Sequence, residues 1–207
     1  MEAAETVQRR TLPKVSKPQT FRDLGAVDCE KLAAMVAKIS DATWQSEDGY
    51  KENKFNVLRH TRHIVLRFIP ANRDPLAFYS EPAWATWKAL IMPVMHQATG
   101  PYGFAEPEFP KVMLARLAAG HSIGRHSDGA GSHEFVHKIH VPLQTHADAL
   151  FHVGDETRHL PAGRAVEVNN IAKHGVTNGS EHDRVHLIFE VFDGATVTDG
   201  PEGARNG

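Results

Sequence analysis

Short apolar runs separated by turn-forming residues fill the sequence from residue 111 to residue 193, and they constrain the fold more than any other feature. Five of these runs are KVMLARLAA, FVHKIHVPLQT, DALFHVGD, RAVEVNN and RVHLIFEVFD. Their alternation of apolar with polar residues is typical of strands that bury one face. Runs of this length at this spacing predict an antiparallel sandwich or jelly roll.

The first half of the chain predicts two helices and one strand. Apolar residues at helical spacing in CEKLAAMVAKIS, up to Ile39, predict a helix with Asp28 as its N-cap. A second helix is expected to begin near Pro82 and to end near Gly100, with a kink at Pro93. Between them, the alternating run HTRHIVLRFIP predicts a strand. The fold class is therefore mostly β with flanking helices, which would pack against the outside of one sheet.

The chain is expected to form one domain over residues 21–193. Its N-terminal part, 21–110, would be helix and strand, and its jelly-roll core would span 111–193. Residues 1–20 and 194–207 lack apolar periodicity and are expected to be flexible.

Composition narrows the classes of partner. The 23 basic and 25 acidic residues give a formal net charge of −2, which does not suggest nucleic acid as a partner. The strongly apolar runs, such as ALIMPVM, are too short to span a bilayer, and no secretory signal pattern is visible. A soluble cytoplasmic protein is expected. Because Cys29 is the only cysteine, no intrachain disulfide can form, and a metal would be held by nitrogen and oxygen ligands.

The stretch HSDGAGSHEFVHKIH contains two competing metal-site signatures. The first, His133, Glu134 and His137, spells the His-Glu-x-x-His of zinc proteases, which works only on a helix. Upstream glycines, β-branched residues and Pro142 favour a strand instead. On a strand the two histidines would lie roughly 13 Å apart, too far to chelate one ion.

The second signature is the His-x-Asp of His126 and Asp128. Two residues apart at a strand end, these side chains project to the same side, and a third ligand from a distant strand would complete a two-histidine, one-carboxylate triad. His174 follows a turn-rich stretch and is the candidate third ligand. Such a site leaves three positions open for a chelating oxoacid and dioxygen. The far carboxylate of the oxoacid then needs a buried cation, for which Arg184 is the candidate.

Alternation predicts where the cationic side chains point. Arg184 and His186 share one face of RVHLIFEVF, and Lys138 and His140 share one face of HKIHVPL. The opposite faces are apolar: Val185, Leu187, Phe189 and Val191 in the first run, and Ile139, Val141 and Leu143 in the second. The cationic groups are therefore expected on the side away from the main core, where a jelly roll can have its mouth.

The blocks RLAAGHSIGRHSD, KIHVPLQT, LFHVGDETRHLPAGRAVEVNN, KHGVTNGSEHDR and VHLIFEVFD resemble the aspartyl/asparaginyl beta-hydroxylase family of Fe(II)- and 2-oxoglutarate-dependent dioxygenases. The resemblance covers Lys111 to Asp193 and implies a double-stranded β-helix, a cupin-like jelly roll. It implies that His126 and His174 are iron ligands and that Arg184 pairs with the far carboxylate of 2-oxoglutarate.

The sequence departs from the family pattern in three places. Lys138 and His140 stand where the family has Arg-x-His; both are implied to contact the cosubstrate, but lysine lacks the bidentate fork of arginine. Ala119 replaces a proline before Gly120. Asp128 stands where the best-known members carry glycine, so that a full triad is expected and the substrate is not carried over.

The expected function is hydroxylation of a C–H bond in an amino-acid, peptidyl or related small-molecule substrate, with consumption of dioxygen and release of succinate and CO2. Two alternatives stay open: a cupin-type metal oxygenase or isomerase that uses no oxoacid, and a jelly-roll module that binds metal or ligand without turnover. Arg184 discriminates among them, because only a cosubstrate site requires it.

Further residues are assigned to the substrate rim or to structural roles. Candidates for the substrate rim are Phe55, His60, Arg62 and Arg67, whose charge would favour a carboxylate-bearing substrate. Asn169 and Asn170 are expected to shape the turn before His174. Structural or surface roles are expected for the tryptophans Trp44, Trp84 and Trp87, for Arg125, and for the histidines His121, His137, His146, His152, His159, His182 and His186, although His186 could line the pocket.

Overall fold

The computed structural model describes residues 10–50, 56–129 and 131–200. Two antiparallel sheets account for most of the strands. The larger sheet has the order β2-β10-β7-β12-β5-β3-β4. Its strands are β2 (Phe21–Ala26), β10 (Arg164–Val168), β7 (His137–Gln144), β12 (Arg184–Asp193), β5 (Pro107–Leu117), β3 (Thr61–Phe68) and β4 (Tyr79–Ser80).

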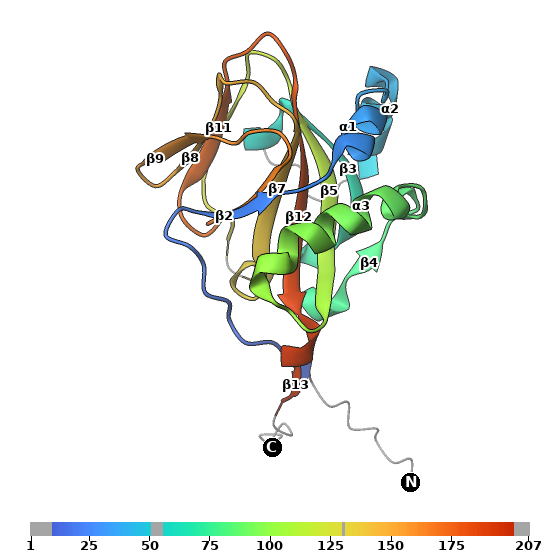
Figure 1. Ribbon diagram of the computed structural model, residues 1–207, viewed down its shortest axis with the longest axis vertical. Coiled ribbons are helices and arrows are strands. Elements are labelled where there is room, and N and C mark those ends of the chain that lie inside the picture. The colour runs from blue at the N-terminus through green and yellow to red at the C-terminus, as the bar shows by residue number, and fades with distance from the viewer. Residues whose placement is uncertain (1–9, 51–55, 130, 201–207) are drawn as a thin grey trace.

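The smaller sheet faces the larger one and lies to the upper left in Figure 1. It has the order β6-β11-β8-β9. Its strands are β6 (Ser122–His126), β11 (His174–Asn178), β8 (Ala149–Val153) and β9 (Glu156–His159). Apolar side chains from both sheets, including Leu117, Phe151 and Val168, form a second core between them. This pair of facing antiparallel sheets is the jelly roll predicted from the sequence.

The main core lies on the other face of the larger sheet, beneath the helices. Helix α3 (Ala83–Thr99) crosses this face, and α1 (Glu30–Val36) and α2 (Asp41–Glu47) lie beside it (Figure 1). The apolar face of β12 packs here with helix residues such as Leu32 and Met95. Arg184 and His186 point to the opposite face, so the predicted division of β12 into two faces is confirmed.

The helix predictions are partly confirmed. Helix α3 is flanked by Pro82 and Gly100 as expected, and Pro93 lies inside it. The N-cap of α1 is Cys29, so the assignment of Asp28 was one residue early; the Asp28 side chain accepts a bond from the Glu30 N–H instead. The helix also stops at Val36, before Ile39. Ser40 then caps α2, since its hydroxyl accepts a hydrogen bond from the Thr43 N–H.

Seven short 3-10 turns and a small two-stranded ribbon complete the described structure. The 3-10 turns are Asp48–Tyr50, Asn56–Leu58, Pro70–Asn72, Pro75–Ala77, Gly100–Tyr102, Ser132–Glu134 and Gly194–Thr196. The ribbon pairs β1 (Arg10–Thr11) with β13 (Thr198–Asp199), at the bottom of Figure 1.

The segment before β2 contacts the domain. The Val15 N–H donates to the Glu134 carbonyl, and the Asn169 N–H donates to the Thr20 carbonyl. The expected flexibility of this segment and of the C-terminal tail stays a prediction, and residues 1–9 and 201–207 lie outside the described residues. No helix in the described parts of the chain is both long and apolar enough to cross a membrane.

Candidate active site

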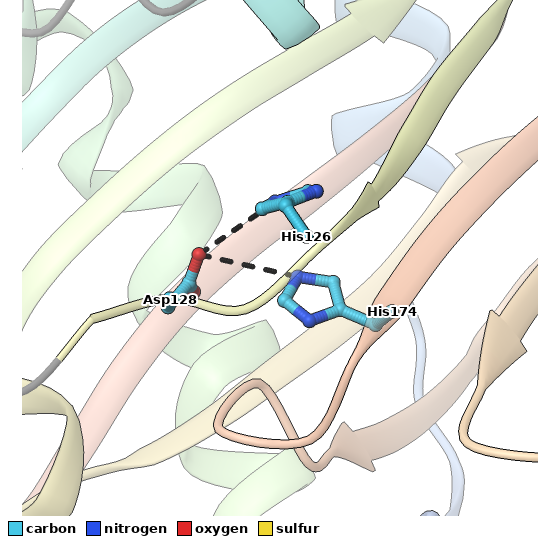
Figure 2. Close-up of side chains that lie close together, drawn as sticks. All are labelled: His126, Asp128 and His174. Atoms are coloured by element: carbon cyan, nitrogen blue, oxygen red, sulfur yellow. Dashed lines mark ion pairs between the residues drawn. The ribbon is translucent and has the colours of Figure 1, made fainter.

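Three potential metal ligands meet where β6 and β11 pair. His126 ends β6 and His174 begins β11, and the two residues are register partners. Asp128 lies in the loop after β6 and turns its Oδ1 toward both rings (Figure 2). The Asp128 Oδ1 lies 3.7 Å from His126 Nε2 and 3.9 Å from His174 Nε2. Among the described residues, this is the one cluster of three such groups with ligand atoms within 4.8 Å of one another.

Backbone carbonyls fix the tautomer of both histidines. The Nδ1 of His126 lies 2.9 Å from the Gly124 carbonyl, and the Nδ1 of His174 lies 3.0 Å from the Ala172 carbonyl. Because a carbonyl can only accept, each Nδ1 carries a hydrogen, and each Nε2 is the ring nitrogen left toward Asp128. Burial lowers the pKa of His174 to about 4, so its ring is neutral near pH 7, as a metal ligand must be.

Asp128 divides its carboxylate between two sets of partners. Its Oδ2 accepts from Lys138 Nζ at 2.6 Å and from Asn170 Nδ2 at 3.1 Å, which leaves Oδ1 for the histidine side. Burial alone would raise the pKa of Asp128, but the nearby Lys138, His133 and His174 hold it well below its ordinary value. The carboxylate is therefore ionised. Two imidazole nitrogens and one carboxylate oxygen are the donor set of a facial iron site, so these residues fit Fe(II).

A glycine allows the two strands to approach. At Gly175, next to His174, an added Cβ would lie 2.9 Å from the Ile123 carbonyl oxygen and 3.2 Å from the Arg125 nitrogen. Both atoms belong to the backbone of β6 and cannot move independently of the strand. Gly175 therefore helps to set the separation of His126 and His174.

A cavity of about 540 Å³ opens beside the three candidate ligands. Its wall includes them together with Arg184, Lys138 and His140, the other three residues predicted for the site. The volume is in the usual range of small-molecule sites. The structure thus brings all six predicted residues to one cavity.

Arg184 is a buried cation at this cavity, only 4% exposed. Its guanidinium donates to the His186 ring and lies over the Phe151 ring. No acidic group of the described residues forms an ion pair with it. Burial lowers the pKa of Arg184 to about 9, so the side chain is still charged at neutral pH. His186 is buried against Arg184 and His140 and does not line the cavity.

Lys138 and His140 differ in their surroundings. The Lys138 ammonium is engaged with Asp128, which raises its pKa against the opposing effect of burial. The His140 ring is buried near Arg184, and burial together with that cation holds the pKa of His140 well below its ordinary value. His140 is therefore neutral. A cosubstrate contact by either residue stays a prediction.

The cavity wall also contains a buried ion pair, Lys111 with Glu190, which was not predicted from the sequence. Lys111 donates to Glu190 Oε1 at 3.1 Å, and His133 Nδ1 lies 3.3 Å from the same oxygen. Glu190 Oε2 and the side-chain oxygen of Asn72, both in residues that line the cavity, have no hydrogen-bond partner among the described residues. A charged residue inside the apolar run LIFEVF was the available signal for Glu190.

The zinc-protease signature is not a metal site. Ser132–Glu134 is a 3-10 turn and β7 begins at His137, so no helix carries the motif and the strand starts two residues later than the run FVHKIHVPLQT suggests. His133 contacts Glu190, whereas His137 lies 2.7 Å from Glu167. The two histidines thus serve different buried carboxylates.

The predicted substrate rim is wrong for the residues that can be assessed. His60, Arg62 and Arg67 do not line the cavity, and Phe55 lies outside the described residues. On β3 alternate residues face opposite sides, so Thr61 and His63 face the cavity, while Arg62 does not. Arg67 instead lies over the Trp84 ring of α3.

The structural roles predicted for the tryptophans and for His121 are confirmed. Trp44 and Trp84 are buried in the main core, and Trp87 packs against it. The His121 ring bonds the Ala119 carbonyl. The departure at Ala119 also has a structural explanation: its N–H donates to the Asp183 carboxylate, a bond that proline could not make.

A jelly roll with two histidines and a carboxylate at the mouth of a cavity is typical of mononuclear non-haem iron oxygenases. The chain belongs to a particular family of that class, because the sequence model described as Aspartyl/Asparaginyl beta-hydroxylase matches residues 86–193, about half of the chain. The match begins earlier than the resemblance noted from the sequence motifs. The protein is thus an Fe(II)/2-oxoglutarate-dependent dioxygenase of the hydroxylase type. A search of curated protein sequences finds no match.

Solved structures share the fold. AviO1 from Streptomyces viridochromogenes Tue57 superposes with a TM-score of 0.55 at 14% identity, covering 89% of this chain and 94% of that chain. A 2OG-Fe(II) oxygenase family oxidoreductase from Burkholderia pseudomallei gives 0.53 at 13% identity, covering 83% and 91%. A Trichoplax adhaerens prolyl hydroxylase, in complex with a peptide fragment of hypoxia inducible factor, gives 0.53 at 12% identity, covering 86% of each chain. At these identities the likeness concerns the fold alone.

Proposed function

We propose that the protein binds Fe(II) through His126, Asp128 and His174, binds 2-oxoglutarate through Arg184, and hydroxylates a C–H bond of an amino-acid, peptidyl or related small-molecule substrate. Succinate and CO2 would be the coproducts. The bound iron and 2-oxoglutarate supply, with dioxygen, the oxidising chemistry of such a reaction. The side chains of the protein hold these groups and control access of water.

The observation that carries the proposal is the burial of Arg184 without an acidic partner among the described residues. Removing a charge from water costs several kcal/mol unless an opposite charge or good hydrogen bonds compensate. A ligand carboxylate would complete the pairing, and a guanidinium binds carboxylate with two parallel hydrogen bonds. Family membership also favours this assignment over an oxoacid-free cupin enzyme or a module without turnover.

The protein's groups have separable roles in this proposal. The two Nε2 atoms and Asp128 Oδ1 would hold the metal, while the backbone carbonyls and Lys138 keep these donors oriented. The apolar wall residues Phe151 and Val176 would exclude water from the cosubstrate.

Two observations support the proposed substrate class: the charges around Glu190 in the cavity wall, and the comparisons with known proteins. Glu190 is ionised, because Lys111 and His133 hold its pKa below the ordinary value against the effect of burial. A carboxylate oxygen without a partner there suits an N–H group of an amino acid or peptide. The family name and the peptide complex of the prolyl hydroxylase are consistent with such substrates.

The experiment compares two oxoacids that differ in the far carboxylate. Binding of 2-oxoglutarate and of 2-oxobutyrate to the Mn(II)-loaded protein would be measured by calorimetry without oxygen. We expect wild type to prefer 2-oxoglutarate by about 10- to 100-fold, the value of a charged hydrogen-bonded pair. In Arg184→Gln the preference should largely vanish, whereas the exposed Arg164→Gln should behave as wild type. An unchanged preference in Arg184→Gln would contradict the assignment, and succinate release with candidate substrates would then test turnover in wild type.

A further inference from the structure

The N-terminal segment places a lysine beside the candidate metal centre. The Lys17 ammonium donates to the Val136 carbonyl at 2.5 Å and to Asn170 Oδ1 at 2.9 Å. These two acceptors belong to the loops before β7 and before β11. Lys17 and Asn170 are 153 positions apart in the sequence, so only the fold brings them together.

Asn170 in turn holds Asp128 by two hydrogen bonds. Its side-chain Nδ2 donates to Asp128 Oδ2 at 3.1 Å, and its backbone carbonyl accepts from the Asp128 N–H at 2.9 Å. Asn170 is completely buried, so water cannot replace these bonds without opening the loop.

Lys17 holds the oxygen end of the Asn170 amide, while Asp128 and the His133 ring contact its nitrogen end. An ammonium can only donate, so the amide oxygen must face Lys17. The amide nitrogen is then directed to the carboxylate of Asp128, to which it can donate. With the amide reversed, its oxygen would face the carboxylate oxygen, and the two acceptors would repel each other.

We infer that Lys17 is a positioning residue of the metal centre, which acts through Asn170 to hold Asp128 in its ligating orientation. The inference rests on the proposed role of Asp128 as a ligand. It makes part of the segment that precedes the jelly roll a component of the site, although that segment contributes no ligand. Outer groups that orient ligands typically change metal affinity by about 10- to 100-fold when removed.

The same segment offers a matched control. Lys14 also pairs with the domain, through Glu134 at 2.6 Å, but its side chain is 68% exposed and its partner is not connected to Asp128 by any bond described above. Replacing either lysine removes one cation that ties the segment to the rest of the fold, through one ion pair for Lys14 and two hydrogen bonds for Lys17. Only Lys17→Met removes a hydrogen bond to the Asn170 amide.

The test uses Co(II), whose visible absorption reports the geometry of its ligands. We expect Lys17→Met to bind Co(II) about 10-fold or more weakly than wild type, with an altered absorption spectrum. Lys14→Met should match wild type in both. In an Asn170→Ala background, Lys17→Met should cause little further loss, because the residue through which it acts is gone. Thermal melts of the metal-free proteins check that each variant is folded.

The outcomes separate this inference from the proposed function. Wild-type affinity and spectrum in Lys17→Met would overturn the inference, as would equal losses from Lys17→Met with and without Asn170. If wild type does not bind Co(II), or His174→Ala binds it equally well, the proposed metal site itself fails. Should Lys17→Met not fold, Lys17→Gln replaces it: its amide nitrogen ends one bond short of the lysine nitrogen, and the same loss is expected.

Discussion

Lys138 and Asp128 make a consistent pair at the scale of single residues. The family pattern has arginine at the position of Lys138, and its best-known members have glycine at the position of Asp128. A guanidinium fork tends to engage both oxygens of a carboxylate, which would draw Asp128 Oδ1 away from the histidines. The compact ammonium of Lys138 instead contacts Oδ2 at 2.6 Å. The lysine thus leaves one oxygen free for a metal.

Removal of this ammonium should weaken metal binding and make it more sensitive to pH. Burial raises the pKa of Asp128 and the Lys138 ammonium lowers it, so the pKa should rise in Lys138→Met. Protons then compete with the metal for Asp128 more strongly as the pH falls. We expect about 10- to 100-fold weaker Zn(II) binding at pH 7, with a steeper decline toward pH 5.5 than in wild type. Competition titrations at several pH values measure both quantities. Parallel pH profiles for the two proteins would contradict the assigned role.

The buried pair Lys111 and Glu190 should show a stability effect that depends on pH. Lys111→Met leaves a buried carboxylate with less compensation, and breaking such pairs costs about 3–5 kcal/mol. Without Lys111, the pKa of Glu190 in the folded variant is higher than in wild type. Protonation of Glu190 at low pH then removes the uncompensated charge and recovers part of the lost free energy of unfolding. The destabilisation should therefore be larger at pH 8 than at pH 5.

Urea denaturation of Lys111→Met at these two pH values measures the effect. The exposed Lys88→Met on α3 is the control and should change stability little at either pH. A loss that is equal at both pH values would show that the lysine contributes packing and not charge compensation.

At the scale of elements, the pairing of β6 with β11 sets the geometry of the candidate ligands. Gly175→Ala would place a Cβ 2.9 Å from a backbone oxygen of β6, so the strands must move apart. We expect a loss of stability of about 1–3 kcal/mol and weaker metal binding, because His126 and His174 lie on the displaced strands. Thermal melts and Co(II) titration measure the two effects. Gly49→Ala is the control, because an added Cβ there meets no atom within 4 Å, and it should leave Co(II) affinity unchanged. An equal loss of affinity in Gly49→Ala would show that the effect of Gly175→Ala does not come from the pairing of β6 with β11.

The sequence predicts the larger sheet better than the smaller one. Strands β5, β7 and β12 have long alternating runs because one face meets the helix-covered core. By contrast β9 and β11 are the short, polar segments ETRH and HGVTN, which lack an apolar period and are not predicted as strands. Their positions depend on pairing with β8, which is a tertiary effect.

The candidate site was predictable where residue type and spacing carry the chemistry. His126, Asp128, His174 and Arg184 follow from the motifs, and the structure places them together. The partners of Asp128 were not predictable, because Lys17 reaches Asn170 across most of the chain. The assignment of rim residues from charge alone failed, since strand alternation turns Arg62 away from the cavity.

At the scale of the whole molecule, a metal would link parts of the fold. Its candidate ligands come from β6, the loop after β6 and β11, and Asp128 is bonded in turn to Lys138 of the larger sheet. Ligation requires the folded state, so saturating Zn(II) at about 100 times its dissociation constant should add about 2.7 kcal/mol to the free energy of unfolding. For a domain of this size the melting temperature should rise by about 5–10 °C.

Differential scanning calorimetry of wild type and His174→Ala measures this linkage. The variant lacks one ligand and should show a much smaller shift at the same Zn(II) concentration. Equal shifts in both proteins would place the stabilising metal elsewhere, for example at surface histidines.

The most direct test of the central claim is anaerobic titration of the metal-free protein with Fe(II) and then 2-oxoglutarate, followed by visible absorption. A 2-oxoacid that chelates Fe(II) gives a weak charge-transfer band. The account predicts this band in wild type, its loss in His174→Ala, and a need for much more 2-oxoglutarate in Arg184→Gln. Fe(II) binding by wild type without a band at any 2-oxoglutarate concentration would contradict the proposed cosubstrate site.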